Sequence, residues 1–135
     1  MSDGRAENRA LHLLAGPFAV CRLEPDGPLP AWLFHAEARI YSMTRTPREL
    51  SVVCPEDDLP PSLERCERGW RMLMLEGPIP FEEVGVLAGL VAPLAAAKVP
   101  VFAISTFDTD ALLVKERDLE RALEALGHTR RIVRE

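Results

Sequence analysis

Two carboxylates and three hydroxyls gather within six consecutive residues of the C-terminal half. They lie in the stretch AISTFDTDALLV (103–114) and belong to Ser105, Thr106, Asp108, Thr109 and Asp110. Asp108 and Asp110 are able to accept charge-assisted hydrogen bonds from a ligand's ammonium group. The hydroxyls of Ser105 and Thr106 can donate to a carboxylate or accept from an ammonium group. An ordinary hairpin turn, in which Asp108 and Thr109 bond their own backbone, explains the same residues without a ligand.

A second candidate lies in residues 76–81, EGPIPF, which precede an apolar stretch. The first N–H groups of a helix have no partner inside the helix and can bind a carboxylate. Gly77 would let a ligand approach the backbone closely. Pro78 and Pro80 lack an N–H, so we expect Ile79, Phe81 and the following glutamates, 82 and 83, to supply the donors. Those two glutamates would compete with a bound anion, and a plain strand-to-helix turn remains the alternative.

The elements that would position both candidates follow from hydrophobic periodicity. Apolar residues at 81, 84, 87, 88, 91, 94 and 95 have helical spacing, and Pro80 suits the first turn of that helix. The expected elements are strand 70–75, helix 81–97 kinked at Pro93, strands 101–105 and 111–114, helix 119–126 and strand 129–133. This β-α-β-β-α-β order is the ferredoxin-like α+β pattern. In that topology the strands on either side of the first helix are neighbours, which brings 76–81 close to 104–108.

The N-terminal half is predicted to be a smaller, β-rich lobe. We expect a disordered tail at 1–9, strands within 11–23, 39–44 and 50–54, a linker at 57–61 and one or two helical turns at 62–67. The segment 41–53 aligns with 104–114 at an offset of 61 to 63 residues, with Ser42 over Ser105 and Thr46 over Thr109. This faint repeat indicates two related lobes, at 10–62 and 68–135, of which the first has truncated helices.

The stretch 69–128 resembles an ACT domain. It has a strand, a Gly-containing turn, a helix opening with Val84-Gly85-Val86, and "VPVFAIST" leading into the next strand. The pattern IST-x-x-TD-x-x-LV is similar to ACT modules of aspartate kinases and of arginine sensors of the CASTOR group. The resemblance implies a tandem ACT-like protein that regulates by binding a small molecule, often an amino acid, at an interface between paired modules.

The composition argues against nucleic-acid binding, membrane association and secretion. The chain has 135 residues and a net charge of -5 with no basic block, so we expect neither nucleic acid nor membrane as a partner. No stretch reaches the roughly 20 apolar residues of a membrane span and no signal peptide is evident, which favours the cytoplasm. Cys21, Cys54 and Cys66 are expected to be reduced, buried thiols.

A catalytic site is also not expected. His12, His35 and His128 lie far apart, and no Cys/His pair, metal-ligand spacing or cofactor fingerprint is present. We therefore predict a non-enzymatic amino-acid-binding regulatory protein, without metal or cofactor, that forms a homodimer through its sheets. The predicted ligand-binding residues are Gly77, Ile79, Phe81, Ser105, Thr106, Asp108 and Asp110. The alternative is a dimerisation module that binds no ligand, with 101–104 or 111–114 as the pairing strand.

Overall fold

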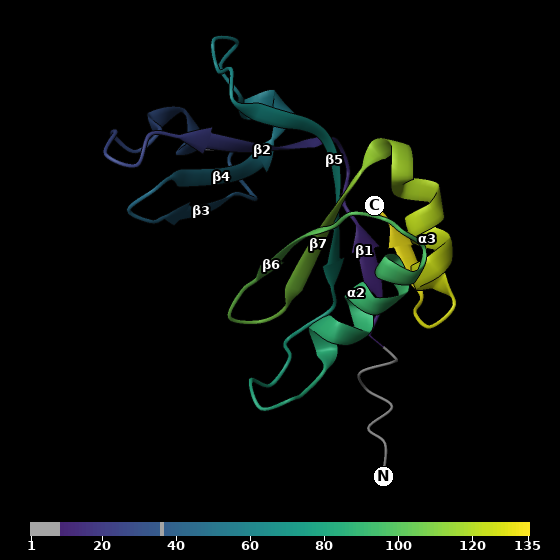
Figure 1. Cartoon of the computed structure of the whole chain (residues 1–135). Coiled ribbons are helices and arrows are strands. Elements are labelled where there is room, and N and C mark those ends of the chain that lie inside the picture. Colours follow the sequence, from purple (N-terminus) through teal and green to yellow (C-terminus); the bar gives the residue numbers. More distant parts are fainter. Residues whose placement is uncertain (1–8, 36) are drawn as a thin grey trace. The chain divides into compact units, whose positions relative to one another are not determined.

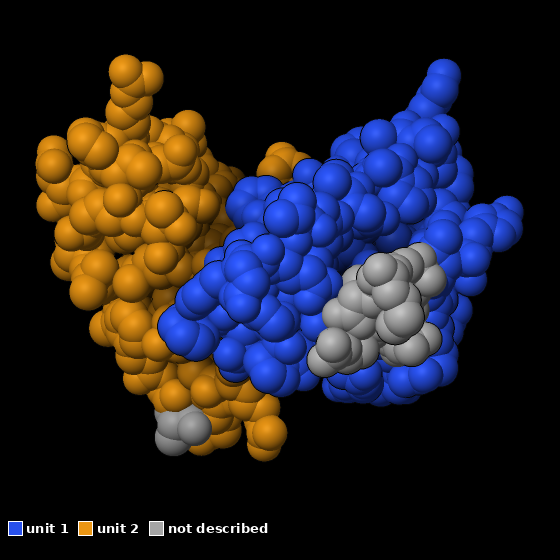
Figure 2. All heavy atoms as spheres, turned by 90° about the horizontal axis from the view of Figure 1, so that it is seen from below, with its two compact units in different colours: residues 1–15, 71–135 blue, residues 16–70 orange. Residues whose placement is uncertain are grey.

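The computed structural model describes residues 9–35 and 37–135, which divide into two compact units. Unit 1 comprises residues 1–15 and 71–135, and unit 2 comprises residues 16–70 (Figure 2). The tail predicted at 1–9 lies outside the described residues, except for Arg9. The predicted boundaries at 62 and 68 differ from the observed ones, because the chain passes from unit 2 to unit 1 inside strand β5 (Cys66–Leu75).

Unit 1 has the predicted β-α-β-β-α-β order (Figure 1). From the end of β5 the chain forms α2 (Val86–Ala96), β6 (Phe102–Ser105), β7 (Asp110–Lys115), a 3-10 turn η3 (Glu116–Asp118), α3 (Leu119–Gly127) and β8 (Ile132–Arg134). Strand β7 lies between β5 and β6. The prediction that the two strands flanking the first helix are direct neighbours is therefore wrong, and the two strands share β7 as a neighbour instead. The predicted ferredoxin-like α+β architecture is confirmed.

One strand of unit 1 comes from the beginning of the chain. Strand β1 (Leu11–Leu13) runs antiparallel to β5, with Leu11 opposite Leu75, and parallel to β8, with Leu11 opposite Ile132. The expectation that this segment begins the N-terminal lobe is wrong. Alternating leucines identify a half-buried strand, but they do not identify the sheet that it joins.

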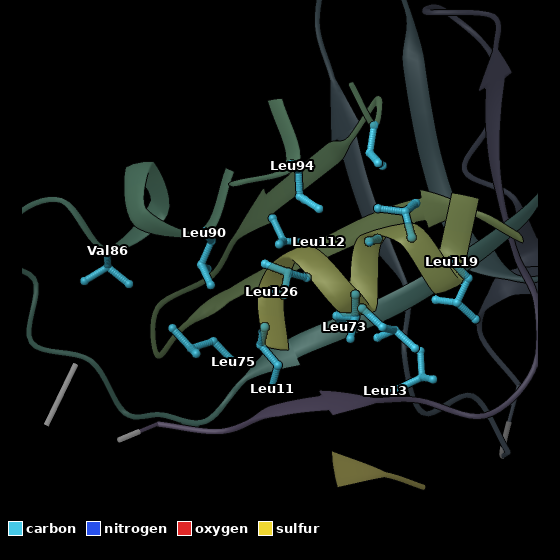
Figure 3. Packing of buried hydrophobic residues seen from close by; sticks show 14 residues of the cluster. Leu11, Leu13, Leu73, Leu75, Val86, Leu90, Leu94, Leu112, Leu119 and Leu126 are labelled. Atoms are coloured by element: carbon cyan, nitrogen blue, oxygen red, sulfur yellow. The ribbon is translucent and has the colours of Figure 1, made fainter. Parts of the chain in front are cut away.

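Both helices of unit 1 pack on the same face of the sheet. The core contains leucines 11, 13, 73, 75 and 112 from the strands, with Leu90 and Leu94 from α2 and Leu119, Leu123 and Leu126 from α3 (Figure 3). Because strand side chains alternate, His12 and Met74 point to the opposite face. This packing fixes the N-terminus of α2 beside the end of β5.

Helix α2 is shorter than predicted, because it begins at Val86 and not at Phe81. Gly85 precedes it in a left-handed conformation with φ of 83°. Phe81 and Val84 match the helical spacing, yet they are 72% and 92% exposed and therefore do not belong to the buried face. Pro80 lies outside the first helical turn, whereas Pro93 lies inside the helix as predicted.

Unit 2 is a reduced version of the same plan. It contains β2 (Phe18–Leu23), the 3-10 turn η1 (Ala31–Leu33), β3 (Ser42–Arg45), β4 (Leu50–Pro55), the 3-10 turn η2 (Glu56–Asp58) and residues 66–70 of β5. The strand order is β3-β4-β2-β5 and all pairs are antiparallel. Each helix of the ferredoxin-like pattern is replaced by one 3-10 turn, so the predicted truncation is confirmed. The helical turns predicted at 62–67 are wrong, because β5 already begins at Cys66.

The two units carry matching hairpins at a constant offset of 60 residues. Thr46 N–H donates to Glu49 O at 2.9 Å, and Thr106 N–H donates to Thr109 O at 2.8 Å. In both turns the threonine hydroxyl also accepts from the last turn residue, at 3.2 Å in each case. The repeat is therefore present, but its register is 60 and needs no looped-out residues. Arg48 of unit 2 occupies the position of Asp108 in unit 1.

The cysteines differ from the sequence prediction. Cys21 on β2 and Cys66 on β5 are opposite each other in the register and form a disulfide, while Cys54 is a buried free thiol. The two partners are 45 residues apart, and strand register, which is a tertiary property, brings them together.

Candidate functional site

A cavity of about 340 Å³ opens in unit 1 between the loop that precedes α2 and the β6–β7 turn. Its lining comes from two segments, at positions 79–81, 83 and 85–87 in the loop and helix start, and at positions 105–110 in the turn. The two segments predicted to be neighbours therefore share one cavity.

Two hydrogen bonds to backbone carbonyl groups hold the two segments together. Ile79 N–H donates to Asp108 O at 2.7 Å, and Thr109 Oγ1 donates to Leu75 O at 2.6 Å. Gly77 permits this approach, since a Cβ at that position would lie 2.8 Å from Asp108 O. Gly77 itself is not among the cavity-lining residues, and the backbone that approaches it is that of the turn.

Most polar side chains of the turn are occupied within the turn. Ser105 Oγ donates to Asp110 Oδ1 at 2.6 Å, and Thr106 Oγ1 donates to Thr109 O at 3.1 Å. Asp108 is different, because it is an exposed residue that lines the cavity and its carboxylate makes no hydrogen bond or ion pair with the described residues. Of the predicted carboxylates, Asp108 is thus the one available to a ligand.

The donors predicted for a carboxylate are placed differently. Ile79 N–H already bonds Asp108 O, and Glu83 N–H bonds Pro80 O. Because α2 begins at Val86, its open N–H groups belong to Val86, Leu87 and Ala88, and the first two line the cavity. The sequence signal for this start was Gly85, which directly precedes the buried apolar run.

Comparison with known proteins places this geometry in a family. A model of the ACT domain matches residues 65–127, and a model of an N-terminal domain matches residues 16–62. The cytosolic arginine sensor for mTORC1 subunit 1 of Bos taurus is 31% identical over 144 residues, which cover 93% of this chain and 44% of the sensor. A solved protein of Agobacterium tumefaciens is 33% identical with a TM-score of 0.85, covering 95% of this chain and 94% of that chain.

The chain belongs to the ACT domain family. The ligand-free regulatory subunit of aspartate kinase from Thermus thermophilus shares the fold, with a TM-score of 0.59 at 14% identity over 84% of this chain and 91% of that one. The chain spans less than half the length of the bovine sensor.

The rim of the ACT cavity carries two aromatic side chains. Phe81 and Phe107 are 72% and 78% exposed, and their rings meet edge to face with centroids 4.8 Å apart. Phe81 was predicted to contribute through its N–H, whereas the structure places its ring at the site. Phe107 was not predicted as a site residue, although it lies between the predicted Thr106 and Asp108.

The charged side chains around the ACT site are partly neutralised. Glu83 lines the cavity and forms a two-pronged ion pair with Arg9, at 2.8 Å and 3.1 Å.

A second charged cluster lies on the sheet face opposite the helices, where His12 lies between Glu76 and Glu135, at 3.0 Å and 3.1 Å. The hydrogen bond from His12, with one from Ala10, lowers the pKa of Glu76 below its usual value.

Within the described residues, no group of three or more His, Cys, Asp or Glu side chains is arranged to hold a metal ion. In that same part of the chain, no helix has the length and hydrophobicity needed to cross a membrane.

Proposed function

We propose that the ACT unit binds a free amino acid and acts as a regulatory module rather than as a catalyst. The observation that carries the proposal is that Val86 and Leu87, with their open N–H groups at the start of α2, and Asp108, whose carboxylate is unpaired among the described residues, line one cavity. The α-carboxylate of the ligand would accept from Val86 and Leu87, and its ammonium group would donate to Asp108. Phe81 and Phe107 would contact the side chain of the ligand.

The names of the matched proteins support this class of function. They are those of a cytosolic arginine sensor and of a regulatory subunit. L-arginine is therefore the first ligand to test. We also propose a cytoplasmic location, because the matched sensor is named as cytosolic.

The equivalent region of unit 2 lacks both the carboxylate that would accept from the ligand's ammonium group and the N–H groups that would donate to its carboxylate. Arg48 replaces Asp108, and the loop between β2 and η1 contains Pro25, Pro28 and Pro30, each without an N–H donor. We therefore expect one ligand per chain, bound in unit 1.

Calorimetry and thermal shift with the twenty common L-amino acids test the proposal. A ligand present at about 100 times its Kd adds about 2.7 kcal/mol of stability, a readily measured shift. Asp108→Asn should weaken binding about 10- to 100-fold by removing a charged hydrogen-bond acceptor. Asp26→Asn is the matched control, because Asp26 is an exposed aspartate in unit 2. Flat titrations for all twenty amino acids, with folded protein, would contradict the proposal.

A second candidate function is self-association through a sheet edge. Strand β6 pairs only with β7 among the described strands, so its outer edge is available to a second copy. The other strand considered from sequence, 111–114, lies in interior strand β7. Ala103→Lys places a charge on an exposed position of β6. Sedimentation should show loss of a homodimer in this variant if β6 is the interface, and an unchanged dimer would exclude β6.

A further inference from the structure

The ion pair between Arg9 and Glu83 connects the start of the chain to the proposed site. Arg9 Nη1 lies 2.8 Å from Glu83 Oε2 and Nη2 lies 3.1 Å from Oε1, so both carboxylate oxygens are engaged. The two side chains are only 14% and 18% exposed. A two-pronged, largely buried pair of this kind constrains both partners more than a surface salt bridge does.

The Arg9 end of this pair is fixed to the sheet. Arg130 Nη1 donates to Arg9 O at 3.3 Å, and Glu76 N–H donates to the next carbonyl, Ala10 O, at 2.9 Å. Leu11 N–H then donates to Arg131 O at 2.9 Å and begins the pairing of β1 with β8. The guanidinium group of Arg9 therefore extends from a backbone that the sheet holds in place.

The Glu83 end lies in the irregular loop between β5 and α2. This loop carries Phe81 at the cavity rim and leads through Gly85 into the open N–H groups of Val86 and Leu87. Glu83 itself lines the cavity. Val86 and Leu87, whose N–H groups would receive a ligand carboxylate, line the same cavity, so the negative charge of Glu83 would oppose the binding of a second anion there.

We propose that Arg9 is a positioning residue for the ligand site, acting through Glu83; this inference rests on the proposed function. Arg9 has two effects. It holds the loop so that the helix start keeps its orientation, and it compensates the charge of Glu83 so that the site accepts a carboxylate. The first effect is conformational and exists without ligand, whereas the second appears only as a preference for anionic ligands.

Hydrogen–deuterium exchange on the ligand-free protein tests the first effect. The variants are Arg9→Gln, Glu83→Gln and the double variant. Arg134→Gln is the control, because Arg134 forms a long and exposed ion pair with Glu120, at 3.8 Å. Either single substitution should accelerate exchange in residues 79–88 about tenfold or more, while β7 and α3 stay protected. The double variant should exchange no faster than the singles, because both remove the same interaction.

Ligand selectivity tests the second effect. The probes are L-arginine and L-argininamide, which lacks the carboxylate. Arg9→Gln should weaken L-arginine binding about tenfold and L-argininamide binding much less. Adding Glu83→Gln to Arg9→Gln should restore most of the affinity for L-arginine, since the competing charge is gone. A purely structural role of Arg9 would weaken both probes equally and would show no restoration.

The possible outcomes separate this inference from the proposed function. Unchanged exchange at 79–88 in Arg9→Gln, or accelerated exchange throughout unit 1, overturns the positioning role. Equal weakening of the two probes overturns charge compensation. If Arg9→Gln does not fold, Arg9→Lys keeps the charge and loses the two-pronged geometry, and the same exchange criterion applies to it. If wild-type protein binds neither probe nor any other common amino acid, the proposed function fails while the exchange experiment still decides the loop-holding role.

Discussion

Replacing Gly77 by alanine tests whether the two segments of the site are held in contact at this glycine. An ideal Cβ at position 77 would lie 2.8 Å from Asp108 O and 3.2 Å from Thr109 Cβ. The oxygen belongs to the backbone, so no side-chain rotation relieves the overlap. The same oxygen accepts from Ile79 N–H at 2.7 Å, and separating the segments would break that bond as well.

The expected cost combines two terms. Overpacking typically destabilises by about 1 to 3 kcal/mol, and the loss of one hydrogen bond adds about 1 kcal/mol. Gly77→Ala should therefore lower the free energy of unfolding by about 2 to 4 kcal/mol. Gly89→Ala is the matched control, because a Cβ there meets nothing within 4 Å and the residue lies inside α2. This control should stabilise the protein by about 0.5 to 1 kcal/mol.

Urea denaturation followed by circular dichroism measures both variants, and calorimetry with L-arginine reports on the site. If Gly77→Ala lowers the free energy of unfolding and Gly89→Ala raises it, the loss at position 77 comes from the surroundings of that glycine and not from the glycine-to-alanine change itself. A Gly77→Ala protein as stable as wild type would refute the close approach.

Three further predictions concern stability. Thr109→Val removes the 2.6 Å hydrogen bond to Leu75 O at nearly constant side-chain volume, so the free energy of unfolding measured in urea should fall by about 1 to 2 kcal/mol. Thr44→Val is the control, because Thr44 is exposed on β3 and its replacement should change that free energy little. Burial, with a smaller effect of Asp58, raises the pKa of Cys54 from 9.0 to about 11. The unfolded thiol releases its proton first, so up to about 2 to 3 kcal/mol of stability present below pH 9 should be lost as the pH rises toward 11, and Cys54→Ala should flatten that dependence. Reduction of Cys21–Cys66 should raise the number of titratable thiols in the denatured chain from one to three. It should also lower the free energy of unfolding by at most about 4 kcal/mol. Three thiols before reduction would contradict the disulfide.

The predictable part of the site came from topology and local chemistry. The prediction that residues 76–81 and 104–108 lie close together is confirmed by the cavity that they share, and Asp108 lines that cavity. The reason given for it was wrong, because β5 and β6 are not neighbours and the β6–β7 turn comes close to the loop through the pairing of β7 with β5. The sequence could not show that Ser105 would bond Asp110, because both side chains could equally have faced a ligand. Nor could it show that Ile79 N–H would be used by Asp108 O, since a backbone donor has no sequence signal of its own.

The periodicity of apolar residues by itself determined the order of strands and helices between residues 70 and 133, and the faint repeat indicated the reduction of helices in unit 2. Tertiary structure alone decided that β1 joins the sheet of unit 1 and that Cys21 meets Cys66. The physical reason is that a local pattern specifies which face of an element is to be buried. The partner that buries it, and the atoms left open beside it, depend on packing between segments distant in the chain.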